Sequence, residues 1–204
     1  MSLSAQLWSA NSDVAADVLA HPFVRGVADG TLPTQRFATY IAQDAFFLES
    51  FARAYALTLA RSRDTPTLLA LADLIGGVRE ELGLHASYAA SWGVDLAGVQ
   101  PLAATSAYTE FLLATAATQD VGVVYAAMTP CMRLYAWLGQ TLDPDRAGPY
   151  GQWVRTYADP GFEAIARVLE NLLDDQAADT PPVRTAYRRA MHLERAFFEA
   201  AVSD

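Results

Sequence analysis

Three side chains that can do chemistry stand where the sequence otherwise predicts a packed hydrophobic face. Asp44, Cys131 and Glu194 each lie among apolar residues spaced three and four apart, the period of a buried helical stripe. A carboxylate there must be paired, hydrogen-bonded or protonated, because burying a bare charge is costly. From the stripe alone, a structural acid and a functional acid explain Asp44 equally well. A lone buried thiol is more often an apolar filler, but Pro130 predicts a helix kink beside it that would suit an exposed nucleophile.

Inward tyrosines shift the interpretation from a core towards a pocket. Tyr108 and Tyr157 fall on the apolar sides of two further predicted helical segments, and Tyr135 lies one turn after Cys131 on the same face. Aromatic walls with a few convergent polar groups are typical of a small-molecule site. Burial raises the pKa of a carboxyl, so we expect Glu194 to stay protonated near neutral pH and to serve as an acid.

A metal centre is a weaker interpretation of the same region. Glu81 and His85 are four residues apart on one predicted helix, and His192 with Glu194 would complete a di-metal bundle. The Glu-x-x-His spacing that such bundles use is absent. We therefore expect Glu81 to hold His85 as a cap or bridge between helices, and we predict neither a metal nor a cofactor. His21 is interpreted as a loop residue.

The elements that position these groups are predicted to be helices throughout. No segment shows the alternation of a β-strand, and no repeat or long linker divides the chain, so residues 1–204 are predicted to form one all-α domain. Thr34 is expected to cap the long helix that carries Asp44, and Ser12 with Asp13 is an alternative start for the first helix. The expected helices cover residues 1–20, 34–59, 64–93, about 105 onward, 121–142, 150–157, 162–172 and 183–202.

Composition excludes several classes of partner. The net charge is −9, and the 14 basic residues are all arginines scattered along the chain, so nucleic-acid binding is not expected. A single cysteine allows no internal disulfide. No leader pattern opens the sequence, and the most apolar run, 121–139, contains Pro130 and Arg133. We therefore predict a cytoplasmic protein without a membrane partner. A hydrophobic fraction of 52% favours an oligomer.

Six segments give the chain a resemblance to a known family over nearly its full length. These segments are HPFVRGVADGTLPTQRFATYIAQDAFFL (21–48), EELGLH (80–85), AYTEF (107–111), TPCMRLYAWLG (129–139), WVRTY (153–157) and LERAFF (193–198). The pattern GxLPxxxFxxYxxQD that ends at Asp44 is the most specific part. On these residues the sequence resembles the TenA family, thiaminase II, which has a haem-oxygenase-like helical bundle fold, and Cys131 with Tyr135 matches the cysteine-bearing branch of that family.

The resemblance implies hydrolysis of thiamine-derived aminopyrimidines. The expected reaction converts 4-amino-5-aminomethyl-2-methylpyrimidine to its 5-hydroxymethyl analogue in thiamine salvage, and thiamine itself is a second expected substrate. By resemblance, Cys131 is the nucleophile, Glu194 the general acid, and Asp44 the group that hydrogen-bonds the pyrimidine. A thiol adds to such a ring only if a ring nitrogen is protonated or strongly hydrogen-bonded as charge develops. The family also implies a homotetramer.

Aromatic residues complete the expected site. By resemblance, Tyr108, Tyr157 and Phe197 line and stack on the pyrimidine ring, with Tyr135 nearby. Phe47 belongs to the same set, although the family commonly has a tyrosine at this position, so one hydroxyl group is missing here.

The sequence departs from the family pattern at further positions, and two other functions remain as alternatives. Met132 and Arg133 follow the cysteine where the family often has a tryptophan, and Leu193 replaces an aromatic residue. The first alternative function is a non-catalytic ligand-binding or regulatory protein. The second is a haem-binding or di-metal redox enzyme on the same bundle.

Overall fold

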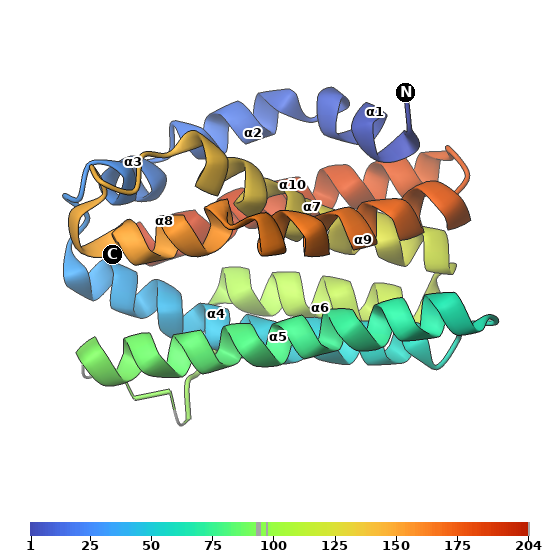
Figure 1. Cartoon of the computed structure of the whole chain (residues 1–204), viewed down its shortest axis with the longest axis horizontal. Coiled ribbons are helices and arrows are strands. Elements are labelled where there is room, and N and C mark those ends of the chain that lie inside the picture. The colour runs from blue at the N-terminus through green and yellow to red at the C-terminus, as the bar shows by residue number, and fades with distance from the viewer. Residues whose placement is uncertain (93–94, 97, 204) are drawn as a thin grey trace.

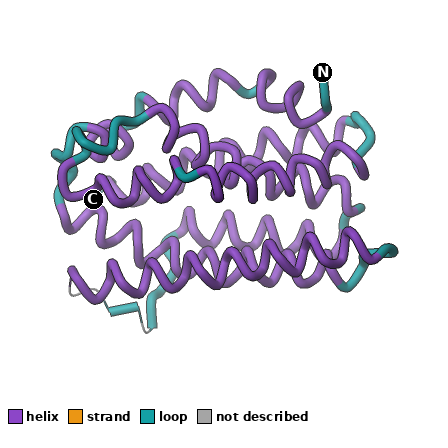
Figure 2. The backbone as a smooth tube through the Cα atoms, in the orientation of Figure 1, coloured by secondary structure: helices purple, strands orange, loops and turns teal. Residues whose placement is uncertain are grey.

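Every regular element of the structure is helical. The computed structural model describes residues 1–92, 95–96 and 98–203, and within these ranges the chain forms helices joined by short loops (Figure 2). The all-α prediction is therefore confirmed, although Gly93, the expected end of one helix, lies outside the described residues. The elements are α1 (Leu3–Ala10), α2 (Ser12–Leu19), α3 (Pro22–Ala28), α4 (Thr34–Leu59), α5 (Thr65–Trp92), α6 (Ala103–Thr118), α7 (Val121–Thr141), a 3-10 turn (Gly148–Tyr150), α8 (Gly151–Ala158), α9 (Pro160–Gln176) and α10 (Pro181–Val202).

The long helices pack in two groups that share one core (Figure 1). Helix α4 packs against α5 and α6, whereas α7 packs against α8, α9 and α10. Helix α10 joins the groups because it also contacts α6 and α4. The short helices α1 to α3 cover the outer side of α9 and α10. Within the described ranges, no helix combines the length and apolar character that a membrane span requires.

Helix α4 forms one wall of the core through its predicted stripe. Its start is set by Pro33 at the N-cap position, and no side chain caps it, so the predicted capping role of Thr34 is wrong. Proline favours this boundary because its fixed φ matches the entry into a helix. The buried members of the stripe are Phe37, Tyr40, Ile41, Phe47, Leu48, Phe51 and Tyr55.

The amino-terminal segment differs from the predicted single helix. It breaks at Asn11, whose side-chain amide turns back and donates to the Leu7 carbonyl (2.7 Å). An asparagine side chain competes with the backbone in this way, which explains why the helix is interrupted there. The next helix, α3, was not predicted. His21 caps it and is buried, with Nε2 3.0 Å from Glu199 Oε2, so the loop interpretation of His21 is incomplete.

Helix α7 carries Cys131 and is anchored on both sides. It continues through Pro130 as a single element, although the proline has no N–H to donate to the preceding turn. Arg133, two residues after the cysteine, donates to Glu163 (2.8 Å) and Glu170 (2.7 Å) on α9. Gly139 allows α8 to approach so closely that a Cβ atom there would lie 2.3 Å from the Tyr157 carbonyl carbon.

Candidate active site

Six helices converge on one buried cluster of polar and aromatic side chains. All eight residues predicted for the site belong to this cluster. They contact one another directly or through Tyr40 and Glu81. Seven are buried, and the exception is Cys131, which keeps some accessible surface. The contributors are Asp44 and Phe47 from α4, Tyr108 from α6, Cys131 and Tyr135 from α7, Tyr157 from α8, and Glu194 and Phe197 from α10. Helix α5 adds Glu81 and His85.

Glu194 lies at the centre of the first part of the cluster. Its Oε1 accepts a hydrogen bond from the Tyr108 hydroxyl (2.7 Å), and the Cys131 thiol lies close enough to influence its pKa. Burial raises the pKa of Glu194 to about 8, and the nearby Asp44 charge adds to the shift, whereas the hydrogen bond from Tyr108 and the neighbouring Cys131 thiol oppose it. The carboxyl is therefore mostly protonated at neutral pH, as expected from the sequence.

Cys131 holds its proton more tightly than an ordinary thiol. Burial raises its pKa well above the usual value, and the carboxyl groups of Glu194, Glu81 and Asp44 raise it further because each disfavours a second negative charge. The thiol is deeply enclosed and yet partly accessible. These two properties agree if the sulfur borders an internal space. Attack by this thiol requires a neighbouring group that accepts its proton.

Asp44 is paired with a histidine that the sequence placed in another role. His85 Nε2 lies 2.7 Å from Asp44 Oδ2, and its Nδ1 bonds to the backbone carbonyl of Glu81 (2.9 Å). Burial lowers the pKa of His85, but the hydrogen bond and charge of Asp44, with the charge of Glu81, raise it to about 9. Asp44 thus has a cationic partner. The Tyr40 hydroxyl also approaches Oδ2 (3.4 Å), so Oδ1 is the oxygen left for a ligand.

Glu81 is a third acid in the cluster and is half-buried. The Tyr157 hydroxyl donates to its Oε1 (2.7 Å). Burial and the Asp44 charge raise the pKa of Glu81 to about 7, against the opposing effects of His85 and Tyr157. Tyr157, predicted to line the pyrimidine, therefore also fixes this carboxyl. The sequence showed Glu81 only as a helical neighbour of His85.

Aromatic rings join the acids on one side of the cluster. The Phe47 ring lies 4.7 Å from Tyr108 and 5.8 Å from Phe197, measured between centroids. Tyr135 and Tyr157 meet edge to face at 4.8 Å. Such walls offer flat apolar surfaces for a heteroaromatic ring.

Tyr40 connects the two sides and was not among the predicted site residues. Its hydroxyl lies 3.0 Å from that of Tyr135 and accepts a hydrogen bond from Trp153 Nε1 (3.3 Å). Its ring meets Phe197 edge to face at 6.0 Å. In the sequence Tyr40 is one aromatic residue of the α4 stripe, four residues before Asp44, and it is also the tyrosine of the pattern GxLPxxxFxxYxxQD.

The four residues considered for a di-metal site do not converge. His192 is exposed on α10, whereas Glu194 of the same helix is buried, and His85 is engaged by Asp44. Across the described part of the chain, no three side chains of the His, Cys, Asp and Glu types are placed to hold a metal ion.

Comparison with known proteins identifies the family. The model of the TENA/THI-4/PQQC family matches residues 8–204. The chain belongs to this family. It is 34% identical to the mitochondrial bifunctional TH2 protein of Arabidopsis thaliana over 97% of its length, but it spans only 37% of that protein. It is 29% identical to the aminopyrimidine aminohydrolase of Halalkalibacterium halodurans, with 100% of this chain and 97% of that protein covered.

Solved structures agree with this assignment. A TenA family transcription regulator from Silicibacter sp. TM1040 superposes with a TM-score of 0.91 at 27% identity, covering 98% of this chain and 96% of the other. A domain of unknown function from Shewanella denitrificans OS217, described as having a heme oxygenase-like fold, gives a TM-score of 0.74 at 17% identity, covering 97% and 90%. The predicted haem-oxygenase-like fold is thus confirmed.

Proposed function

We propose that this TenA family member hydrolyses thiamine-derived aminopyrimidines, with 4-amino-5-aminomethyl-2-methylpyrimidine as substrate and the 5-hydroxymethyl compound as product. The observation that carries the proposal is the partly accessible Cys131 thiol beside Glu194, in one cluster with the Asp44–His85 pair. The similar length and name of the Halalkalibacterium relative support it. The corresponding biological role is thiamine salvage.

Asp44 and the aromatic walls hold the ring in this proposal. Asp44 Oδ1 accepts from the 4-amino group or a protonated ring nitrogen, while His85 keeps the carboxylate in place from the other oxygen. Tyr108, Phe197 and Phe47 pack against the faces and edges of the ring.

Glu194 accepts and donates the protons that the proposed reaction transfers. Its ionised form takes the proton from the Cys131 thiol, and the thiolate adds to the ring while the electron pair moves onto a ring nitrogen polarised at Asp44. The bond between the methylene carbon and nitrogen then breaks, and Glu194 returns a proton to the departing amine as the general acid. Water adds to the methylene carbon, its proton returns to the carboxylate, and the thiolate is expelled and reprotonated. One C–N bond is exchanged for one C–O bond.

A non-catalytic regulator is the second candidate, and the name of the Silicibacter neighbour is what favours it. The same buried cluster would then bind the pyrimidine without turning it over. One assay separates the two functions, because only the hydrolase releases amine.

Replacing Cys131 by serine tests the proposal. We expect Cys131→Ser to abolish amine release from the aminomethyl pyrimidine, because an alcohol is a far weaker nucleophile, while calorimetry shows nearly unchanged binding of the hydroxymethyl product. Glu194→Gln should likewise lose rate with little loss of fold. A Cys131→Ser protein that keeps most of its rate would exclude covalent catalysis, and a wild-type protein that binds without releasing amine would support the regulator.

A further inference from the structure

Gln43, the residue before Asp44, uses both ends of its side-chain amide to hold another helix. Its Oε1 accepts from the Leu102 N–H (2.8 Å) and from the Thr105 hydroxyl (2.7 Å), and its Nε2 donates to the Gln100 carbonyl (3.1 Å). Gln43 is 7% exposed, and Thr105 is fully enclosed. A buried amide needs hydrogen-bond partners, and these partners all lie on the segment that leads into α6.

The start of α6 depends on this amide because α6 has no cap of its own. Leu102 occupies the N-cap position, and a leucine side chain has no oxygen to accept from the first turn. In a capping box, a side chain of the first turn reaches back to the N–H of the N-cap residue. At α6, Gln43 of the neighbouring helix makes that bond, and it also binds the hydroxyl of Thr105 in the first turn. Polar contacts at one residue of α4 therefore fix where α6 begins.

Tyr108 lies one helical turn after Thr105 and carries this position into the active site. Residues three apart lie on the same side of a helix, so a shift of the first turn moves the tyrosine with it. The Tyr108 hydroxyl donates to Glu194 Oε1 (2.7 Å), and its ring packs on Phe47 of α4 (4.7 Å between centroids). Helix α4 thus holds the tyrosine in two ways, through the amide of Gln43 and through an aromatic contact.

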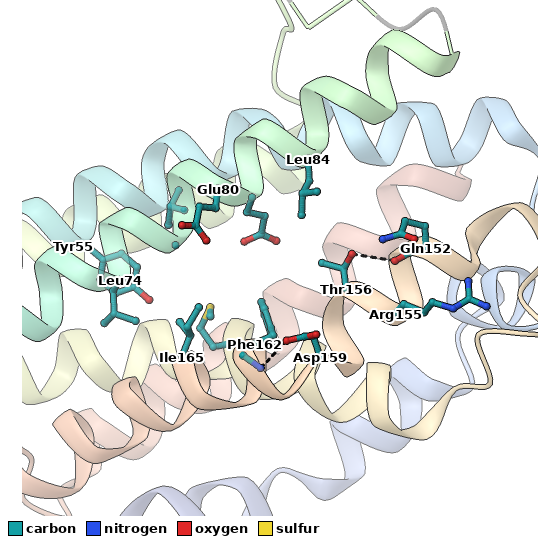
Figure 3. Close-up of a pocket in the computed structure, with 15 residues that line it drawn as sticks. Tyr55, Leu74, Glu80, Leu84, Gln152, Arg155, Thr156, Asp159, Phe162 and Ile165 are labelled. Carbon is teal, nitrogen blue, oxygen red and sulfur yellow. Dashed lines mark hydrogen bonds between the residues drawn. The ribbon is translucent and has the colours of Figure 1, made fainter.

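Gln43 is not placed to contact a small molecule in the space beside the cluster. A cavity of about 460 Å³ lies there, between α5 on one side and α8 and α9 on the other (Figure 3). Of the described residues that line it, one is Glu81, whereas Gln43 and the residues of α6 are absent from the wall. An effect of Gln43 on the reaction must therefore pass through the residues that it holds.

We propose that Gln43 is a positioning residue of the hydrolysis, which fixes the start of α6 and so keeps the Tyr108 hydroxyl on Glu194. The effect on the reaction rests on the proposed function, whereas the effect on the Glu194 carboxyl does not. The amide acts through the tyrosine and touches neither the pyrimidine nor the thiol.

The protonation of Glu194 reports whether the tyrosine is in place. Burial raises the pKa of Glu194, and the Tyr108 bond opposes this because it stabilises the ionised form, so loss of the bond raises the pKa further. The titratable groups that face Glu194 from the neighbouring helices are Asp44 of α4, Tyr108 of α6, and Cys131 and Tyr135 of α7.

Infrared titration tests this role without catalysis. A protonated carboxyl absorbs apart from a carboxylate, and the band of Glu194 is assigned by its absence from Glu194→Gln. In the wild-type chain this band should disappear with a midpoint near pH 8. In Gln43→Ala the midpoint should rise by about one pH unit, the size expected when a charged group loses one hydrogen bond.

The pH dependence of the rate separates positioning from a loss of stability. With a higher pKa at Glu194, kcat/KM of Gln43→Ala should fall about tenfold near pH 7 and return to within about twofold of wild type near pH 9.5. A residue that only stabilised the fold would lower the rate equally at both pH values.

Further variants keep the test sharp. Thr105→Val removes only the hydroxyl and should raise the midpoint by less than Gln43→Ala does, whereas Thr105→Ser keeps the bond and should not move it. Gln176→Ala removes an amide that donates to Thr67 (2.8 Å) between α9 and α5, and it should leave the midpoint unchanged. In a Tyr108→Phe background, Gln43→Ala should add no further shift, because the bond through which it acts is already absent.

Several results would overturn the role of Gln43. They are wild-type midpoints in both Gln43→Ala and Thr105→Val, an equal loss of rate at both pH values, and a full shift that persists in the Tyr108→Phe background. If Gln43→Ala does not fold, the two Thr105 variants decide. If the wild-type chain releases no amine while the midpoints move as expected, the proposed function fails and the hold of Gln43 on Glu194 stands.

Discussion

At the scale of single residues, the acid beside the thiol determines how activity should depend on pH. Glu194 has a pKa of about 8, so it is almost fully protonated at pH 6 and increasingly ionised towards pH 9. If its ionised form takes the thiol proton first, kcat/KM should rise about tenfold per pH unit below pH 8 and level off above it. Initial rates at low substrate concentration between pH 5.5 and 9 measure this profile.

The Glu194→Gln variant is the control for that profile, because its remaining activity should lose this rising limb. A wild-type rate that instead falls above pH 8 would show that the protonated carboxyl is needed from the start, with another group accepting the thiol proton.

Phe47 is the residue at which this chain departs from its family within the aromatic wall. Its ring is 3% exposed and packs against Tyr108 and Phe197. A hydroxyl group on residue 47 would lie near Tyr108, whose own hydroxyl donates to Glu194. If it orients the thiol or a water molecule, Phe47→Tyr should raise turnover of the aminomethyl pyrimidine about tenfold, the worth of one good hydrogen bond to a charged group.

Rate and melting temperature should be measured on the same Phe47→Tyr protein. An unchanged rate with a lower melting temperature would mean that the added oxygen is buried without a partner. The pocket would then have repacked around phenylalanine for a different substrate.

The sequence predicted the individual site residues better than it predicted which of them contact one another. Asp44, Cys131 and Glu194 were visible because each interrupts an apolar stripe. The partner of Asp44 was not visible, since helical spacing relates Glu81 to His85 but says nothing about a residue 41 positions away.

At the scale of elements, the contact between α7 and α8 positions Tyr157, and it depends on Gly139. A Cβ atom at this position would lie 2.3 Å from the carbonyl carbon of Tyr157 and 2.4 Å from the backbone nitrogen of Ala158, and backbone atoms cannot yield as a flexible side chain can. Gly139→Ala should therefore push α8 outward, lower stability by about 1–3 kcal/mol and raise KM, because Tyr157 holds Glu81.

Gly76 provides a matched control on α5. A Cβ atom added there meets no atom of another described segment within 4 Å, so Gly76→Ala should stabilise the chain by about 0.5–1 kcal/mol through the lower entropy of the unfolded state. Urea unfolding of both variants measures the difference. Equal stabilities would show that α7 and α8 tolerate a wider separation.

The helices were predictable where a long stripe and a clear boundary coincide, as for α4 after Pro33 and for α5 after Asp64, whose carboxylate accepts from the Thr67 N–H (2.8 Å). The short helices were not predictable in this way. The break at Asn11 depends on one side-chain hydrogen bond, and α3 is a seven-residue helix whose burial comes from its neighbours. Local sequence carries little information about either.

At the scale of the whole molecule, exposed leucines on α4 and α5 are the surface that we propose for contacts between subunits. Leu57 near the end of α4 is 40% exposed, and Leu68 and Leu69 near the start of α5 are 40% and 56% exposed, in a chain whose net charge is −9. We propose that they contribute to the interfaces of a homotetramer, so light scattering at micromolar concentration should give about four times the 22.1-kDa chain mass.

Leu69→Glu should shift that mass towards smaller species, because an interface that buries leucine cannot bury an unpaired carboxylate. Gln35→Glu adds the same charge at an exposed position in the first turn of α4 and should leave the mass unchanged. A monomer mass for the wild-type chain would contradict the tetramer itself. A Leu69→Glu protein that keeps the wild-type mass would instead place the interface on another face, and the exposed leucines of α4 and α5 would then need a different explanation.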